Sequence, residues 1–211
     1  MRTLVFSDLH GNLPALETLL AIESRVDQLL CLGDNVNYAP WSNECVELID
    51  QLPNCQCLLG NHEEFFLSGK YGGRSEIGQA FFQHCYPRFR LKSTIANYLP
   101  SAILDSFLCT HTLEDRYLFH DSPIDLEQDS IIGHSHQQYL VERSGFQLLN
   151  PGSVGQDRKY INRANYAIYD SLTKEVELKN FIFDIDVVIQ EMERQDYPQI
   201  CLDYYLGKER L

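Results

Sequence analysis

The sequence predicts an α/β protein in which two β-sheets face each other and helices lie on the outer sides. Three observations support this fold class. Residues 1–60 alternate apolar, strand-like runs with helical patterns, which is typical of parallel strands joined by crossover helices. Residues from 130 onward form short β-type runs separated by turns, and residues 184–194 return to a helical period. The chain of 211 residues is interpreted as a single domain over residues 1–211.

The first half of the chain supplies the parallel strands and the helices that connect them. Leucines recur at helical spacing after Asn12, a residue type that caps helices, so residues 12–24 are expected to be helical. Val46 and Ile49 lie three apart and indicate a second helix over residues 42–50. The expected strands are the apolar runs at residues 2–7, 27–32 and 55–59.

The second half supplies shorter strands and a helical C-terminus. Residues 76–99 are loosely helical, whereas the polar and acidic residues 112–129 indicate a loop or a solvated helix. Residues 143–145, Arg-Ser-Gly, predict a hairpin turn. Residues 185–192 place four apolar side chains on one helical face. The expected strands lie at residues 106–110, 130–133, 138–142, 146–150, 165–170 and 175–183.

The charge of the chain excludes several classes of partner. Thirty acidic residues against 17 basic ones give a formal net charge of −13. A protein with this much negative charge has no large basic surface. We therefore expect neither duplex nucleic acid nor an anionic membrane as a partner, and any nucleotide that it binds should be small. The only net-positive segment is residues 130–179, which contains Arg158. A small phosphate-bearing substrate is expected to enter there.

The cysteines and the N-terminus indicate a reducing location. Seven cysteines are an odd number, they include no CxxC pair, and they are interpreted as free thiols. The first acidic residue, Asp8, comes too early for the apolar centre of a signal peptide, and no run approaches 18 apolar residues. We therefore expect a cytoplasmic protein.

Metal-binding residue types follow predicted strands at five places. In a parallel sheet the carboxyl ends of neighbouring strands lie side by side, so such residues converge from distant parts of the chain. Two divalent cations need a bridging carboxylate, with imidazoles and an amide oxygen completing each set of ligands. Asp34 is the natural bridge. The five segments contribute Asp8 and His10, Asp34, Asn61 and His62, His111, and His134 and His136.

The order of these motifs, D-x-H, G-D, G-N-H-E, H and G-H-x-H, is similar to that of the calcineurin-like metallophosphoesterases, in particular their compact bacterial and archaeal phosphodiesterase branch. The similarity covers nearly the whole chain and is weakest at residues 64–105. It implies the metallo-dependent phosphatase fold, a four-layer α/β/β/α sandwich. It also implies two divalent metal ions, with manganese expected first and iron, nickel or zinc as alternatives.

The resemblance also implies a role for each residue. Of the two histidines that precede G-H-x-H, His111 is preferred to His120 because it ends a predicted strand. Water shared between the two cations would act as a hydroxide nucleophile, and His62 would assist departure of the alcohol. One metal would be held by Asp8, His10, Asp34 and His136, and the other by Asp34, Asn61, His111 and His134.

Other residues have two interpretations each. Asn12 is either a helix cap or a phosphate ligand, and Arg158 is either a phosphate clamp or a surface residue. Glu63 either orients His62 or begins a helix. Tyr38 and Trp41 follow Asp34 and either line the pocket or pack in a turn.

The loop after Asp34 separates the chain from a sister family. Asn37 and Tyr38 stand where serine/threonine protein phosphatases carry an aspartate and an arginine, which argues against protein phosphatase activity and leaves open what orients His62. The expected function is hydrolysis of a small phosphate ester, with a diester preferred over a monoester. The alternatives are nucleotide-polyphosphate or protein phosphatase activity at the same site and, least favoured, a silent binding scaffold. Phenylalanines at 65, 66, 81 and 82 are assigned to the core or to a self-association face, so a homo-oligomer stays open.

Overall fold

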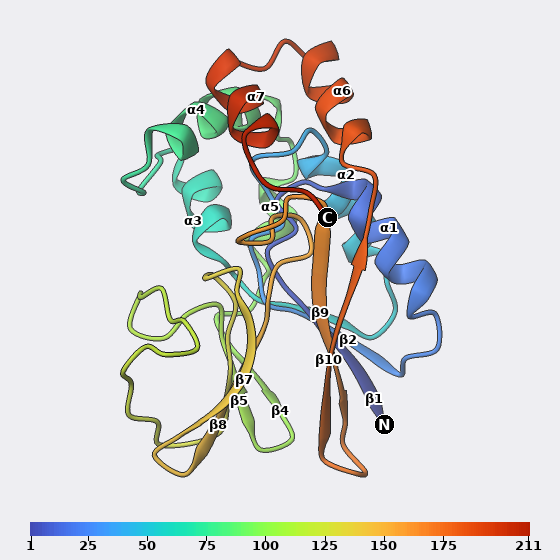
Figure 1. The fold of residues 1–211 in the computed structure, drawn as a ribbon, viewed down its shortest axis with the longest axis vertical. Helices are drawn as coiled ribbons and strands as arrows, with labels where there is room; N and C mark the ends of the chain where they lie inside the picture. The colour runs from blue at the N-terminus through green and yellow to red at the C-terminus, as the bar shows by residue number, and fades with distance from the viewer.

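A computed structural model describes residues 1–211 and contains two five-stranded sheets that face each other (Figure 1). The first sheet has the order β10-β9-β1-β2-β3. Strands β1, β2 and β3 run parallel, as the alternating pattern of the first 60 residues predicts, and β9 pairs antiparallel with β1. The bounds are Arg2–Phe6 for β1, Gln28–Cys31 for β2, Cys55–Cys57 for β3, Arg163–Asp170 for β9 and Glu175–Ile182 for β10.

The second sheet has the order β4-β5-β6-β8-β7. Its central strands β5, β6 and β8 are parallel, and the outer strands β4 and β7 are antiparallel to their neighbours. The β7–β8 hairpin turns at Ser144 and Gly145, both with positive φ, which is the geometry that two-residue hairpin loops favour. The bounds are Ala102–Leu104 for β4, Phe107–Cys109 for β5, Ser130–Ile131 for β6, Gln138–Arg143 for β7 and Phe146–Pro151 for β8.

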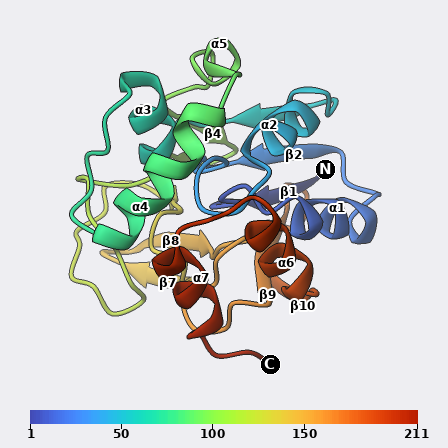
Figure 2. The same ribbon diagram turned by 90° about the horizontal axis from the view of Figure 1, so that it is seen from above.

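The helices cover the outer face and one end of the first sheet (Figures 1 and 2). In Figure 2, α4, α6 and α7 lie together above the end at which β1 and β2 finish. Apolar residues of α6 are buried on one side, as their spacing predicts. The bounds are Leu13–Ile22 for α1, Ser42–Asp50 for α2, Asn61–Ser68 for α3, Glu76–Cys85 for α4, Lys92–Ile95 for α5, Asp186–Arg194 for α6 and Gln199–Leu206 for α7, with a 3₁₀ turn at Tyr86–Arg88.

Alternation along β1 connects the two halves of the core. Leu4 and Phe6 are buried in the large cluster formed with the helices. Val5, between them, belongs to a second buried cluster with Ile131 and Leu149 of the facing sheet. Because successive side chains of a strand point to opposite faces, β1 is covered on both sides, and its carboxyl end is held rigidly between layers.

The predicted two-sheet α/β fold is confirmed, with two differences in its assembly. Strands β9 and β10 come from the second half of the chain but complete the first sheet, because β9 pairs with β1 over Arg2–Val5. The outer face of the second sheet is covered by the segment 112–129 instead of by helices. Leu118 and Leu126 of this segment pack on Tyr139 and Leu148. No helix of the structure is both long enough and apolar enough to cross a membrane.

Candidate metal centre

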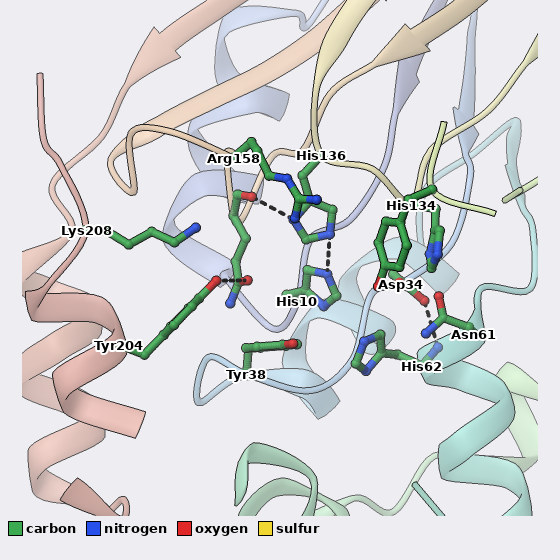
Figure 3. Close-up of a pocket in the computed structure, with 12 residues that line it drawn as sticks. His10, Asp34, Tyr38, Asn61, His62, His134, His136, Arg158, Tyr204 and Lys208 are labelled. Atoms are coloured by element: carbon green, nitrogen blue, oxygen red, sulfur yellow. Dashed lines mark hydrogen bonds between the residues drawn. The ribbon is translucent and has the colours of Figure 1, made fainter. Parts of the chain in front are cut away.

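The predicted metal ligands meet at one end of the two sheets (Figure 3). Their donor atoms form groups in which all members lie within 4.8 Å of one another. Each ligand follows a strand or begins the helix after it, as the topology of parallel strands requires. The three groups are Asp8 with His10 and His136, Asp34 with His111 and His134, and Asp34 with His10 and His62.

The backbone of the site is held in an unusual conformation. Five of the predicted ligands have left-handed backbone with φ between 48° and 64°, although none of them is glycine. Such conformations cost free energy and persist only where surrounding structure enforces them, and they concentrate at functional sites. Gly33, between β2 and Asp34, makes the tight turn possible, because a Cβ there would lie 2.6 Å from the nitrogen of Gly60. The five residues are Asp8, His10, Asp34, His134 and His136.

Three histidines are oriented by backbone carbonyl groups. Nδ1 of His10 donates to the carbonyl of Val36 at 3.3 Å, and Nδ1 of His136 donates to that of Gln156 at 2.8 Å. Nδ1 of His111 donates to the carbonyl of Leu32 at 2.9 Å. With a proton on Nδ1, each ring in its neutral form presents the lone pair of Nε2 to the site, which is the arrangement found for histidine ligands of metals.

The first group contains facing acceptors that call for a cation. Nε2 of His10 lies 3.1 Å from Nε2 of His136, and Asp8 Oδ1 lies 3.3 Å from the same His136 atom. Asp8 Oδ1 is buried and has no hydrogen-bond partner. Buried lone pairs at such distances repel unless a positive charge sits among them. Nitrogen and carboxylate donors of this kind suit a divalent transition metal.

The second group also brings side-chain oxygen and nitrogen atoms close together. Asp34 Oδ2 lies 3.2 Å from Nε2 of His111, and Asn61 Oδ1 lies 3.1 Å from that nitrogen. His134 stands beside them and stacks on Tyr117 with ring centroids 4.0 Å apart. Asp34 also belongs to the third group, with His10 and His62, so it lies between His10 of the first group and His111 of the second, where a bridging carboxylate is needed.

The ionisation of these groups follows from burial and mutual contact. Burial raises the pKa of Asp8, but the neighbouring His136 outweighs it and lowers the value to about 2. Burial lowers the pKa of His134 to about 4, and it also lowers that of His10 well below its ordinary value. His111 is opposite, because the Asp34 carboxylate overcomes the effect of burial and raises the pKa of His111 to about 10. The carboxylates are therefore charged, and this buried negative charge favours a cation.

Glu63 holds the loop that carries Asp34. Its carboxylate accepts hydrogen bonds from the backbone N–H groups of Asp34 at 2.8 Å, Asn35 at 2.7 Å and Gly60 at 3.0 Å. The side chain is fully buried, and burial, followed by the charge of Asp34, raises its pKa to about 7. No hydrogen bond joins Glu63 to His62, so Glu63 positions the proposed bridge and not the histidine.

His62 is oriented by Asn37. The side-chain amide of Asn37 donates to Nδ1 of His62 at 3.0 Å, and the backbone N–H of His62 donates to Asp34 Oδ1 at 2.8 Å. Because Nδ1 accepts, the proton of the neutral ring lies on Nε2. Burial lowers the pKa of His62, which keeps the ring neutral. The sequence left open which residue orients His62, and this contact identifies Asn37.

The structure favours the helix-cap interpretation of Asn12. Asn12 is fully buried and lies outside the pocket, and both ends of its side-chain amide are engaged within the protein. Its oxygen accepts from the N–H of Ala15 and its nitrogen donates to the carbonyl of Gly155, each at 3.2 Å. Asn12 is therefore a helix cap. Trp41 also lies outside the pocket, packed against the core, whereas Tyr38 and Arg158 line it.

The pocket contains residues that the sequence analysis missed. It encloses about 430 Å³ of empty space, its open mouth included, beside the metal ligands. Gln156 connects two sides of the pocket. Its backbone carbonyl accepts a hydrogen bond from Nδ1 of His136, and its side-chain oxygen accepts one from the Tyr204 hydroxyl at 3.3 Å. Tyr117 and Tyr204 reach the pocket through the packing of the 112–129 segment and of α7, Lys208 follows α7, and Gln156 lies in the segment between β8 and β9. The four are Tyr117, Gln156, Tyr204 and Lys208, of which Figure 3 labels Tyr204 and Lys208.

Comparison with known proteins agrees with this geometry. The family model for calcineurin-like phosphoesterases matches residues 1–150. An uncharacterised protein of Methanocaldococcus jannaschii is 29% identical, over 92% of this chain and 93% of its own. A metallophosphoesterase of Sphaerobacter thermophilus has a similar structure, with a TM-score of 0.77 and 22% identity over 98% of each chain. A hypothetical protein of Pyrococcus horikoshii reaches a TM-score of 0.85 at 14% identity, over 97% of each chain. The latter two show a shared fold.

Proposed function

The chain belongs to the calcineurin-like phosphoesterase family and is thus a hydrolase of phosphoric ester bonds, and we propose that its substrate is a small phosphodiester. The observation that carries this proposal is the convergence of a full set of nitrogen, carboxylate and amide donors with a neutral, oriented histidine beside them. The net charge of −13 disfavours duplex nucleic acid as a substrate, and the limited pocket volume favours a small molecule.

Two divalent cations would be held by the two groups of donors, with Asp34 shared between them. We propose manganese as the native metal, with iron, nickel and zinc as the alternatives that mixed nitrogen and oxygen donors also accept. When bound, such a pair lowers the pKa of water so that it can attack phosphorus, and it offsets the negative charge that develops on the phosphate oxygens. The two groups are Asp8, His10, Asp34 and His136, and Asp34, Asn61, His111 and His134.

The side chains of the pocket complete the reaction. His62 carries its proton on Nε2 and lines the pocket, so it is placed to donate that proton to the leaving oxygen. Arg158 lines the same pocket, where its guanidinium group can bind an anionic group of the substrate. Tyr38, Tyr117 and Tyr204 form aromatic walls that suit an organic substituent on phosphorus. These walls support a diester, which carries an organic group on both sides.

The test is hydrolysis by the manganese-loaded protein of bis-p-nitrophenyl phosphate and p-nitrophenyl phosphate. We expect the diester to be the better substrate, and we expect Asp34→Asn and His62→Ala to reduce kcat by at least about 100-fold. An Asp50→Asn variant serves as control, because Asp50 is exposed at the end of α2 and does not line the pocket. Failure to hydrolyse either ester, or wild-type rates in Asp34→Asn, would refute the proposal. Repeating the assay with iron, nickel and zinc tests the choice of metal.

A nucleotide-polyphosphate hydrolase is the second candidate. It is favoured by Lys208 and Arg158, two cationic side chains in the same pocket. Adding a dinucleoside tetraphosphate to the same assay separates the two candidates, because only a polyphosphatase would prefer it to the aryl diester.

A further inference from the structure

Two cationic side chains line the pocket together with the metal ligands, Arg158 beside His136 and Lys208 farther from them (Figure 3). Arg158 lies in the segment after β8, and Lys208 follows the last turn of α7. They come from parts of the chain 50 residues apart, and the packing of α7 on the core brings them to one place. Neither forms an ion pair with a carboxylate in the structure.

No acidic side chain is available to neutralise them within the pocket. Of the 12 residues that line it, Asp34 is the only carboxylate, and it lies among the metal ligands. The ammonium group of Lys208 has one hydrogen bond, to the backbone carbonyl of Asp157 at 3.3 Å. Burial, followed by the charge of Arg158, lowers the pKa of Lys208. Lys208 is half-buried and Arg158 is exposed at the mouth of the pocket, and a bound anion would offset the repulsion between their like charges.

Aromatic rings hold both side chains in place. The ammonium group of Lys208 lies 5.0 Å from the ring centre of Tyr204. The guanidinium carbon of Arg158 lies 5.1 Å from the ring centre of Phe119 and 5.7 Å from that of Tyr117. Contacts of this type restrict long side chains and reduce the entropy lost when they bind a ligand. The two cations are therefore positioned in advance of binding.

The scissile phosphodiester does not account for both charges. It carries a single negative charge, which the metal ions would offset when bound. A guanidinium and an ammonium together match a phosphate group that carries up to two further negative charges. We propose that Arg158 and Lys208 form a second anion subsite, which binds a phosphate group of the substrate other than the one that is hydrolysed. This inference rests on the proposed ester hydrolysis at the metal centre and narrows the substrate to phosphodiesters that bear an additional phosphate.

A matched pair of chromogenic substrates tests this subsite. The p-nitrophenyl ester of thymidine 5′-phosphate has one phosphate, and its 3′-phosphorylated form differs from it only by a second one. We expect the manganese-loaded protein to show a kcat/KM at least about tenfold higher for the form with two phosphates. Lys208→Met and Arg158→Met should each reduce that ratio severalfold. Lys159→Met and Arg25→Met remove the same charges at exposed positions outside the pocket, and they should leave the ratio unchanged.

A binding measurement separates this inference from the proposed function. Calorimetric titration of the His62→Ala protein with thymidine 3′,5′-bisphosphate and with thymidine 5′-phosphate compares the same two ligand classes without turnover. We expect the bisphosphate to bind about tenfold more tightly, and Lys208→Met to remove the difference. Hydrolysis of both esters with a ratio near one, or equal binding of the two nucleotides, would overturn the subsite while leaving the proposed function intact. Failure to hydrolyse either ester, with the bisphosphate still preferred in binding, would instead refute the proposed function.

Discussion

The amide of Asn37 donates a hydrogen bond to Nδ1 of His62 at 3.0 Å, and the ring of the adjacent Tyr38 lies 5.4 Å from that of His62. The backbone at Asn37 has φ of 75°, a conformation that asparagine tolerates better than most residues. A carboxylate at this position would favour a charged imidazolium ring. An amide favours a neutral ring whose proton lies on Nε2, so Asn37 determines the form in which His62 meets the leaving group.

Asn37→Gly should therefore weaken the reaction most for poor leaving groups. Glycine fits the left-handed backbone without strain, and it removes the hydrogen bond to His62 together with the rest of the buried side chain. With aryl phosphodiesters whose leaving phenols span a range of pKa, we expect the variant to show a steeper dependence of kcat on that pKa than the wild-type protein does. A purely structural role for Asn37 would lower all rates by the same factor, and that parallel loss would contradict the prediction.

Glu63→Gln should loosen the metal centre. The carboxylate accepts three backbone hydrogen bonds, and a glutamine amide would place a donor against another donor in a buried position. We expect a loss of about 1–3 kcal/mol of folding stability in urea titrations. Calorimetric titration with Mn²⁺ should show metal affinity reduced about 10- to 100-fold. Glu64→Gln, at the exposed neighbouring position, is the control and should change neither quantity.

Metal binding should stabilise the fold. Asp8 Oδ1 is buried without a hydrogen-bond partner, and the facing nitrogens of His10 and His136 share its environment. A cation that binds the folded state alone raises Tm in proportion to the logarithm of its concentration above Kd. Thermal unfolding with increasing Mn²⁺ should therefore show a rising Tm, and Asp8→Asn should reduce the rise. An equal rise in wild-type and variant proteins would mean that the metal binds elsewhere.

The site was more predictable from the sequence than its surroundings. Residues such as His10 and His134 follow predicted strands, and the rule that strand ends converge was enough to bring them together. Lys208 could not be found in this way, because it has no motif and reaches the pocket only through the packing of α7. The role of Asn12 could not be decided from the sequence, because asparagine suits both a helix cap and a phosphate ligand. Its hydrogen bonds with Ala15 and Gly155 identify it as a cap.

In the fold as well, elements that depend on neighbouring residues were predicted, and the long-range pairing of β9 with β1 was not. Local patterns predicted the helix after Asn12 and the hairpin at Ser144, because both depend on neighbouring residues. The pairing of β9 with β1 joins residues more than 160 positions apart, and no local pattern specifies it. Short elements such as β4 were also missed, since three residues carry too little periodicity to be recognised.

Acid should destabilise the protein partly through His84, which lies outside the pocket. This side chain is 8% exposed, its ring packs on Tyr197 with centroids 3.8 Å apart, and its Nε2 has no hydrogen-bond partner. Burial, followed by the charge of Arg88, lowers its pKa from 6.5 to about 4. As the pH falls below 6.5, the unfolded chain binds a proton that the folded chain does not, so stability is lost until the pH passes below about 4.

This linkage gives a measurable difference between two histidine variants. The loss attributable to His84 between pH 7.5 and pH 5.0 is about 2 kcal/mol. His84→Phe keeps an aromatic ring against Tyr197 and cannot be protonated, so its free energy of unfolding should fall less over that interval than that of the wild-type protein. Urea titrations in EDTA exclude the separate effect of metal loss. His120→Phe changes an exposed histidine and should keep the wild-type pH dependence. If His84→Phe keeps it as well, burial of His84 does not govern the acid sensitivity.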